Sequence, residues 1–472
     1  MEEQFNEPIH PINPRRKIRS KMQIFKENYL PLIIAGIAII LIIIFIIGSI
    51  VRAVQRRDAE KAALYNASSA ATAERARLEE AANKLIANAK SLMANYEYES
   101  AINLLNSFEG DISEFPAIND VILECEAAQR DMVTWTDPNQ IPNLSFQLLV
   151  ADPARGFNRG SMINQKFVTT EEFSKILQQL YDNGYILVNM DDFIITETNA
   201  AGNVVYKYKP LVLPKGKKPV MITQTNVNYN YYLIDSNDDK IPDAGGAGIA
   251  SKLLWDGNTF SCEMVDANGK TVTGDFDLIP ILEKFISAHP DFSYRGARAT
   301  IALTGYNGLF GYRTHPDTVD SYDRNTEIEG AKKVATALKN AGYTLAYYTY
   351  DNSRSYMDSS LTKIKSDLMK WSDEVESIVG EFDTIVYAQD EDISEEKEYS
   401  GDKFNLLYEN GFHYYIGFAD SGSSWTTITD TYIHQGRIMV CGATMYHNAN
   451  WFDGMFDSVS VLDPTRGNIP TY

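Results

Sequence analysis

The distribution of apolar and polar residues divides the chain into three parts. Residues 1–28 are polar, interrupted by proline and without apolar periodicity, so we expect a disordered tail. Residues 30–51, LPLIIAGIAIILIIIFIIGSIV, contain no charged residue. As a helix rising about 1.5 Å per residue, this run is long enough to cross a hydrocarbon core of roughly 30 Å. The pattern predicts a membrane-spanning helix over residues 29–51.

Basic residues flank the apolar run on both sides. Six Lys and Arg precede it, whereas Arg52, Arg56, Arg57 and Lys61 follow it. The excess of Lys and Arg before the run favours a cytoplasmic N-terminus and an extracytoplasmic C-terminal part. The alternative is a cleaved signal peptide, which would have a shorter apolar core and a small-residue cleavage site soon after it. We therefore expect a single-pass protein of the plasma membrane.

Helical spacing of apolar residues continues after this run. The residues that form one helical stripe are Leu64, Leu78, Leu85, Ile86 and Leu92. Further helices are predicted at residues 100–108 and 118–135, and the segment resembles one tetratricopeptide-type hairpin. We expect a helical stalk over residues 52–141, which separates the next domain from the membrane and offers a surface for a protein partner.

Short apolar runs alternate with amphipathic stretches from residue 142 to residue 472. Thr169 and Glu172 have the spacing of a capping box, which opens a helix. Helices are predicted at 171–183, 278–289, 327–340, 361–378 and 403–410. Strands are predicted at 145–151, 185–189, 220–223, 299–304, 344–348, 384–387 and 413–416. Repeated β-then-α units indicate an α/β fold with a parallel sheet, open or closed into a barrel, and functional residues at the carboxyl ends of its strands.

The chain is acidic and poor in cysteine. It has 43 Lys and Arg against 63 Asp and Glu, and the part beyond residue 29 has 37 against 59, a formal charge near −22. Such a surface repels nucleic acid and suits a neutral or cationic partner, although solubility alone also explains it. Cys125, Cys262 and Cys441 are too few and too scattered for a disulfide framework or a cysteine zinc site. We expect them to pack as small apolar residues.

Several segments at the predicted strand ends together resemble one known family. They include IPNLSFQLLVADP at 141–153, PVMITQTNVNYNYY at 219–232, GYTLAYYTYDN at 342–352 and FDTIVYAQDEDI at 382–393. In order and spacing, residues 142–472 resemble polysaccharide deacetylases of the NodB-homology family, in particular their membrane-anchored bacterial branch. The resemblance implies a distorted (β/α) barrel of about seven units that acts on N-acetylated sugar polymers.

The resemblance also implies a metal site. In the family, one Asp and two His hold a divalent metal, and a second Asp acts as a base on a metal-bound water. Here the paired Asp positions carry Thr225 and Asn226, the two His positions carry Tyr348 and Asn352, and Gln389 lies in the next degenerate motif. Thr, Asn and un-ionised Tyr are poor substitutes for carboxylate and imidazole as zinc ligands. We therefore expect no cofactor and no catalysis by the family mechanism.

Aromatic and amide side chains remain at the predicted strand ends. The candidates for contact with sugar rings are Asn226, Tyr229, Tyr306, Tyr348 and Trp425. The tyrosine and tryptophan rings among them have faces on which a sugar can stack. The alternative is that many of these tyrosines simply pack, because Tyr is intermediate in burial.

Other candidate sites carry less weight. Asp235, Asn237, Asp239 and Asp243 have the alternating oxygen spacing of a calcium loop, but the twelfth position is Gly246 instead of Glu, which favours a surface turn. Five histidines share no metal-ligand spacing with one another: His289, His315, His413, His434 and His447. Three aspartates flank the degenerate motifs: Asp351, Asp390 and Asp392. Flanking positions on a strand end point away from the pocket, so we expect no rebuilt metal site.

Two functions of different classes follow. The first is an extracytoplasmic pseudo-deacetylase that binds cell-wall or surface N-acetylated polysaccharide, or acts as a scaffold. The alternative is an active zinc-type N-acetyl amidohydrolase with relocated metal ligands. A protein that binds a partner and has no affinity for glycan is also compatible with the sequence.

Overall fold

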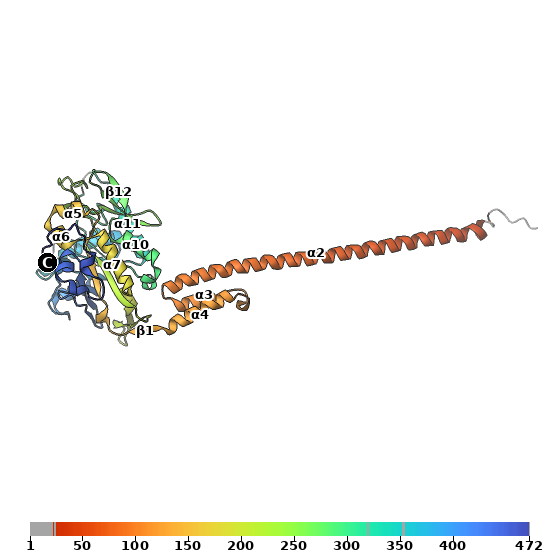
Figure 1. The fold of residues 1–472 in the computed structure, drawn as a ribbon, viewed down its shortest axis with the longest axis horizontal. Helices are drawn as coiled ribbons and strands as arrows, with labels where there is room; N and C mark the ends of the chain where they lie inside the picture. The colour runs from red at the N-terminus through yellow and green to blue at the C-terminus, as the bar shows by residue number, and fades with distance from the viewer. Residues whose placement is uncertain (1–21, 23–24, 319–320, 352–354, 472) are drawn as a thin grey trace, which may run out of the picture. The chain divides into compact units, whose positions relative to one another are not determined.

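The computed structural model describes residues 22, 25–318, 321–351 and 355–471 (Figure 1). The chain divides into two compact units, residues 1–82 and 83–472. The first unit contains the π-helix η1 (Phe25–Tyr29) and most of α2 (Leu30–Ala94). The N-terminal part of α2 is long and apolar enough to cross a membrane. Its apolar run and the following polar stretch form one uninterrupted helix, and most of the predicted tail lies outside the described residues.

The second unit begins with a small group of helices. The end of α2 is followed by α3 (Tyr98–Asn106), η2 (Ile112–Glu114) and α4 (Pro116–Arg130), and α3 lies beside α4 (Figure 1). Their shared core consists of Ala89, Ala101, Leu105, Ile118, Val121 and Cys125. The helix predicted at 118–135 is wrong at its end. The β-prone residues after Asp131 instead form β1 (Met132–Trp135), which pairs antiparallel with β8 (Leu211–Pro214).

Seven parallel strands close into a barrel. They are β2 (Asn143–Phe146), β9 (Lys218–Gln224), β13 (Thr300–Leu303), β14 (Thr344–Tyr347), β15 (Thr384–Val386), β16 (Tyr414–Phe418) and β18 (Ile433–Met439). The order is β13-β14-β15-β16-β18-β2-β9, and β9 pairs again with β13, where Thr223 lies opposite Thr300. The predicted seven-unit barrel is therefore confirmed.

Helices connect and surround the strands (Figure 1). They are α5 (Pro153–Arg159), α6 (Ser161–Lys166), α7 (Thr170–Asp182), α8 (Met190–Phe193), α9 (Tyr231–Ile234), α10 (Leu278–Ala288), α11 (Arg324–Ala341), α12 (Leu361–Trp371), α13 (Ser377–Val379), α14 (Asp402–Glu409), α15 (Gly442–His447) and α16 (Ser458–Val461). The capping box of α7 is confirmed, because the Glu172 N–H donates to Thr169 Oγ1 at 3.1 Å. The helix predicted over 361–378 is confirmed as one continuous run of α12, the π-helix η6 (Ser372–Glu376) and α13, and the π-turn within it was not predicted.

Shorter elements decorate the barrel. The short 3₁₀ turns are η3 (Pro138–Gln140), η4 (Pro290–Phe292), η5 (Tyr294–Gly296), η7 (Ala388–Asp390) and η8 (Ala449–Phe452). The remaining strands are β3 (Leu149–Val150), β4 (Val168–Thr169), β5 (Tyr185–Leu187), β6 (Ile194–Thr198), β7 (Val204–Tyr208), β10 (Lys252–Trp255), β11 (Phe260–Val265), β12 (Thr271–Gly274) and β17 (Thr426–Ile428). The strand predicted at 145–151 is split into β2 and β3 by residues 147–148. β10, β11 and β12 form an antiparallel sheet that the sequence pattern did not indicate.

The barrel strands bury both of their faces. Leu144, Ile222 and Ile301 face outward and belong to the large core under the helices. The inner face is partly polar, with Asn143 Nδ2 donating to Gln435 Oε1 at 3.0 Å and Thr223 Oγ1 donating to Asn143 Oδ1 at 2.8 Å. Near-continuous burial of this kind is typical of parallel strands covered by helices.

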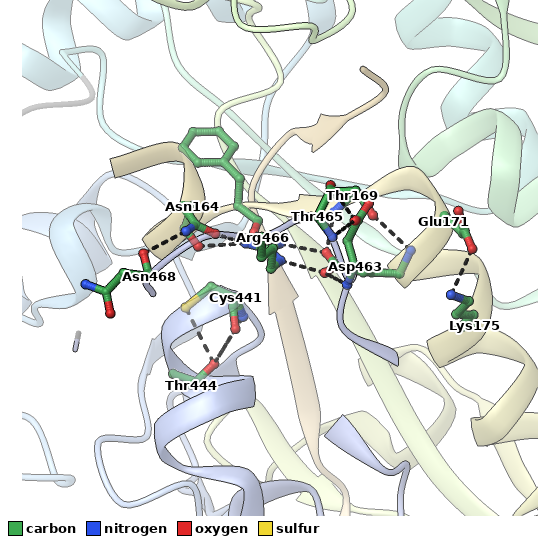
Figure 2. A network of polar contacts seen from close by, with 12 residues as sticks. Asn164, Thr169, Glu171, Lys175, Cys441, Thr444, Asp463, Thr465, Arg466 and Asn468 are labelled. Atoms are coloured by element: carbon green, nitrogen blue, oxygen red, sulfur yellow. Dashed lines mark hydrogen bonds and ion pairs between the residues drawn. The ribbon is translucent and has the colours of Figure 1, made fainter. Parts of the chain in front are cut away.

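A buried ion pair holds the C-terminal segment beside the end of β18 (Figure 2). Arg466 contacts both carboxylate oxygens of Glu172, with Nε at 2.6 Å and Nη2 at 2.7 Å, and Nη1 donates to the Asn164 carbonyl. Gly442 lies against this network, since a Cβ there would meet Asn164 O and Arg466 Nη1. Removing one partner of a bidentate, buried pair leaves a charge without its counter-ion, so the pair fixes this segment.

Candidate functional site

Unfavourable backbone conformations cluster at the carboxyl ends of four neighbouring barrel strands. The non-glycine residues with positive φ there are Asn226 and Tyr229 after β9, Asn307 and Phe310 after β13, Thr349 after β14 and Gln389 after β15. Thr349 has φ 59° and is fully buried, which is exceptional for a β-branched residue. Such strain persists only where the surroundings enforce it, and it concentrates at binding and catalytic sites.

One carboxylate holds the strained loop after β14. Asp367 on α12 accepts hydrogen bonds from the Tyr347 and Tyr356 hydroxyls, the latter at 2.9 Å, and from the Tyr350 N–H at 2.8 Å. The carbonyl of Tyr350 in turn accepts a hydrogen bond from the Thr304 hydroxyl at 2.7 Å. The ends of β13 and β14 are thereby joined.

The predicted metal positions on β9 and β14 do not fit a zinc ion. Thr225 is 1% exposed, and its hydroxyl has a long 3.4 Å contact with the Phe146 carbonyl. Tyr348 is 5% exposed and belongs to an apolar cluster that also contains Ala302 of β13 and Ala388 of η7. A ring packed in an apolar cluster supplies no charged ligand for an ion.

The remaining degenerate positions give no ligand set. Asn226 is half-buried with φ 62°, and Gln389 is exposed with φ 61°. Asn352 lies outside the described residues. Across the described ranges, no three His, Cys, Asp or Glu side chains are grouped so that they can hold a metal ion. The groups at these degenerate positions are amides, a hydroxyl and a ring, which bind through hydrogen bonds and stacking.

Tyr229 lies in the core and does not face a ligand, contrary to the sequence-based expectation. It is fully buried, and its hydroxyl donates to Asp277 Oδ2 at 2.6 Å. Asp277 Oδ1 also accepts hydrogen bonds from the Gln224 side chain at 2.7 Å and from the Leu149 N–H at 3.0 Å. Burial raises the pKa of both Asp277 and the Tyr229 phenol. Asp277 therefore ties β3 to the end of β9 and to the loop that follows it.

A groove of about 400 Å³ lies where the chain leaves β9 and β13. It is lined by Arg159, Tyr231, Tyr232, Asp235, Ser236, Asp238, Lys240, Tyr306 and Asn307. Tyr232 and Tyr306 are 67% and 45% exposed, so their ring faces are accessible. We refer to this set of residues as the tyrosine groove. Tyr306 was predicted as a glycan contact from the sequence.

Arg313 is a buried residue that contacts the loops of the tyrosine groove. It is 1% exposed, and its guanidinium donates to the carbonyls of Asn307 at 2.9 Å and Tyr229 at 3.0 Å. The same group stacks 4.2 Å from the ring centroid of Tyr231. One buried cation thus connects the loops after β9 and β13 and orients a groove ring. Sequence pattern alone gives no signal for this role.

The groove residue Tyr231 and two asparagines that precede it in the chain have buried polar atoms without partners. The Tyr231 hydroxyl is buried and forms no hydrogen bond among the described residues, and the same holds for the side-chain carbonyls of Asn228 and Asn230. Burial raises the pKa of Tyr231 to about 12, with Arg313 opposing the shift, so the phenol is neutral and can donate. Buried groups of this kind are rare and usually have a functional explanation.

Trp425 lies away from the tyrosine groove. Its ring packs against the backbone of Gly436 on β18 and meets the His434 ring edge-on at 4.5 Å. His434 is buried, with Nε2 2.9 Å from Asp392 Oδ2 and Nδ1 donating to the Lys397 carbonyl at 2.8 Å. This His434–Asp392 pair was missed because its members share no ligand spacing and are 42 residues apart.

The acidic loop 235–243 is a turn held by its own side chains. Asp235 accepts hydrogen bonds from the N–H groups of Asn237, Asp238 and Lys240 at 2.8–3.0 Å. Asp243 accepts hydrogen bonds from Ser236 and Gly245. Asn237 and Asp239 each cap the residue two positions on. The loop forms one rim of the tyrosine groove.

Comparisons with known proteins give distant structural likenesses. No family model and no curated protein matches the chain. A Streptococcus pyogenes deacetylase, PplD, solved in complex with acetate, is similar with 12% identity and a TM-score of 0.34 over 71% of this chain and all of that one. A de-N-acetylase from Aggregatibacter actinomycetemcomitans is similar with 11% identity and a TM-score of 0.35 over 66% of this chain and 99% of that one.

Proposed function

We propose that this protein is a membrane-anchored, non-catalytic member of the deacetylase-like barrels that binds N-acetylated glycan at the cell surface. The binding site is the tyrosine groove, at the carboxyl ends of β9 and β13. The observation that carries the proposal is the combination of two exposed tyrosine rings with an unpaired, buried hydroxyl in one groove. Sugar rings stack on aromatic faces, while their hydroxyl and acetamide groups pair with polar atoms.

The chemistry of the strand ends supports the proposed lack of catalysis. A carbonyl-attacking water requires a base and charged metal ligands, whereas Thr225 and Tyr348 supply neither and are packed inside the barrel. Losing several cooperating groups removes activity far beyond the sum of single losses. The remaining role for this end is recognition.

Glycan binding is tested with the full chain in a detergent that has no sugar headgroup. Calorimetric titration with an N-acetylglucosamine tetramer should show binding, and a glucose tetramer should bind less because it lacks the acetamide. Tyr232→Ala and Tyr306→Ala should each weaken binding about tenfold, since each removes a stacking ring. Tyr231→Phe should weaken it about fivefold, because it removes one hydrogen bond.

The matched control is Tyr446→Ala, which removes a tyrosine that is equally exposed but lies on α15. It should leave the affinity unchanged. Absence of binding to any N-acetylated oligomer by the folded chain would contradict the proposal and favour a protein partner. Acetate release above the blank, abolished by a chelator, would favour the relocated-ligand enzyme instead.

A further inference from the structure

A second, smaller cavity lies at the amino end of the barrel. Its volume is about 40 Å³, and its lining includes the first residues of three adjacent strands, Thr300, Thr344 and Thr384. Met221 and Ile416 form its inner wall. A water or small ion needs roughly 10–15 Å³ of such space and several polar partners. The cavity is large enough for an ion with one or two waters.

The threonine hydroxyls in this cavity are incompletely satisfied. Thr300 is 5% exposed, and neither its hydroxyl nor that of Thr344 forms a hydrogen bond within the described part of the chain. The Thr384 hydroxyl donates to Asp383 Oδ1 at 2.9 Å. Neither the Thr300 nor the Thr344 hydroxyl is among the buried atoms that lack a partner in the described residues, so both are open to the cavity and available to a polar occupant.

Two carboxylates stand at the open side of the same cavity. Asp191 on α8 and Asp383 before β15 both line it and remain accessible to solvent. Burial and the charge of Asp383 raise the pKa of Asp191, and a hydrogen bond from the Tyr414 side chain opposes the shift, so the two carboxylates repel one another. No Lys or Arg is among the described residues that line the cavity. A cation between the carboxylates would remove this repulsion.

We propose that this cavity binds a hard, oxygen-preferring cation of the calcium class, with Asp191, Asp383 and Thr300 as protein ligands. The donor set contains only oxygen, which disfavours soft metals, and its irregular arrangement suits calcium better than the strict octahedron of magnesium. The ion links α8 to the starts of β13 and β15 at the base of the barrel. This site is independent of the tyrosine groove and of its ligand.

The test is calcium-dependent thermal unfolding of the full chain after treatment with a chelator. Added calcium should raise the melting temperature with a saturable dependence, because an ion that binds the folded state stabilises it. Asp383→Asn should weaken the apparent calcium affinity at least tenfold. Asp239→Asn, in the acidic loop 235–243, should leave it unchanged, and magnesium should stabilise less.

Thr300→Val provides an isosteric second test that keeps the barrel packed. It should weaken calcium affinity about threefold to tenfold. The proposal would be overturned if Thr300→Val were more stable than the parent in the presence of chelator and had the same calcium affinity. The Thr300 hydroxyl would then not be a calcium ligand. Calcium stabilisation that disappears in Asp239→Asn and persists in Asp383→Asn would place the ion in the acidic loop and also overturn it.

Discussion

The two ends of the barrel are built in different ways. At the carboxyl end, the loops after β9, β13, β14 and β15 each contain a non-glycine residue in a left-handed conformation, and buried carboxylates and Arg313 hold them. At the amino end, Thr300, Thr344 and Thr384 begin their strands with ordinary backbone conformations around a small polar cavity. Left-handed residues thus gather at the end at which (β/α) barrels place their ligand sites, although Tyr96 and Arg295 near the amino end also have positive φ.

Removing Asp277 should produce the largest loss of stability. Asp277→Ala leaves the Tyr229 hydroxyl, the Gln224 amide and the Leu149 N–H buried without an acceptor. We expect about 4 kcal/mol of destabilisation and a loss of glycan affinity, because each orphaned group costs about 1–3 kcal/mol. Chemical unfolding measures the first effect and calorimetry the second. Asp277→Asn, which keeps one acceptor, should lose less than half as much.

The amino end should depend on the preceding helices. Tyr96 stacks on Tyr294 with centroids 5.8 Å apart, its hydroxyl donates to the Asp291 carbonyl, and it belongs to the core at the barrel base. Tyr96→Ala should therefore cost about 3 kcal/mol. A fragment of residues 142–472 should melt at a lower temperature than one of residues 83–472. Equal melting temperatures would show that the helices contribute nothing to the barrel core.

Acidity should affect the amino end through Asp192. Burial raises the pKa of this carboxyl to about 6, and the hydrogen bond that it accepts from the Asn189 N–H at 2.7 Å opposes this shift. The folded state thus holds the proton more tightly than the unfolded chain, whose pKa is about 3.9. Asp192 contributes stability that is complete below about pH 4 and is lost as the pH rises to 6, about 2–3 kcal/mol in all. Asp192→Asn should flatten the dependence of the unfolding free energy on pH between 4 and 6, and an unchanged slope would contradict the assignment.

Sequence pattern predicted the barrel better than the site. Alternating units, the capping box at Thr169 and the apolar strand cores depend on local periodicity, and the structure contains them. Side-chain direction depends on tertiary packing, so Tyr229 and Tyr348 were predicted as ligand contacts although both are buried. Arg313 and Asp277 each form a hydrogen bond with Tyr229, more than 45 residues away, and such pairs leave no local pattern.

The smallest effect should come from relieving the strain at Thr349. A left-handed conformation costs an L-residue roughly 1–2 kcal/mol, whereas glycine adopts it freely but loses about 0.5–1 kcal/mol in chain entropy. Thr349→Gly also loses the hydrogen bond to the Asp351 carbonyl at 2.9 Å, so the net gain in stability should be about 0.5 kcal/mol at most. Thr344→Gly, in an unstrained strand at the amino end, should instead be destabilised by about 1 kcal/mol.

If the strain serves recognition, Thr349→Gly should bind the N-acetylglucosamine tetramer more weakly despite its stability, because the loop that joins β14 to Thr304 and Tyr306 is no longer held in one conformation. Unchanged affinity in a stabilised variant would mean that the strain at Thr349 has no part in binding.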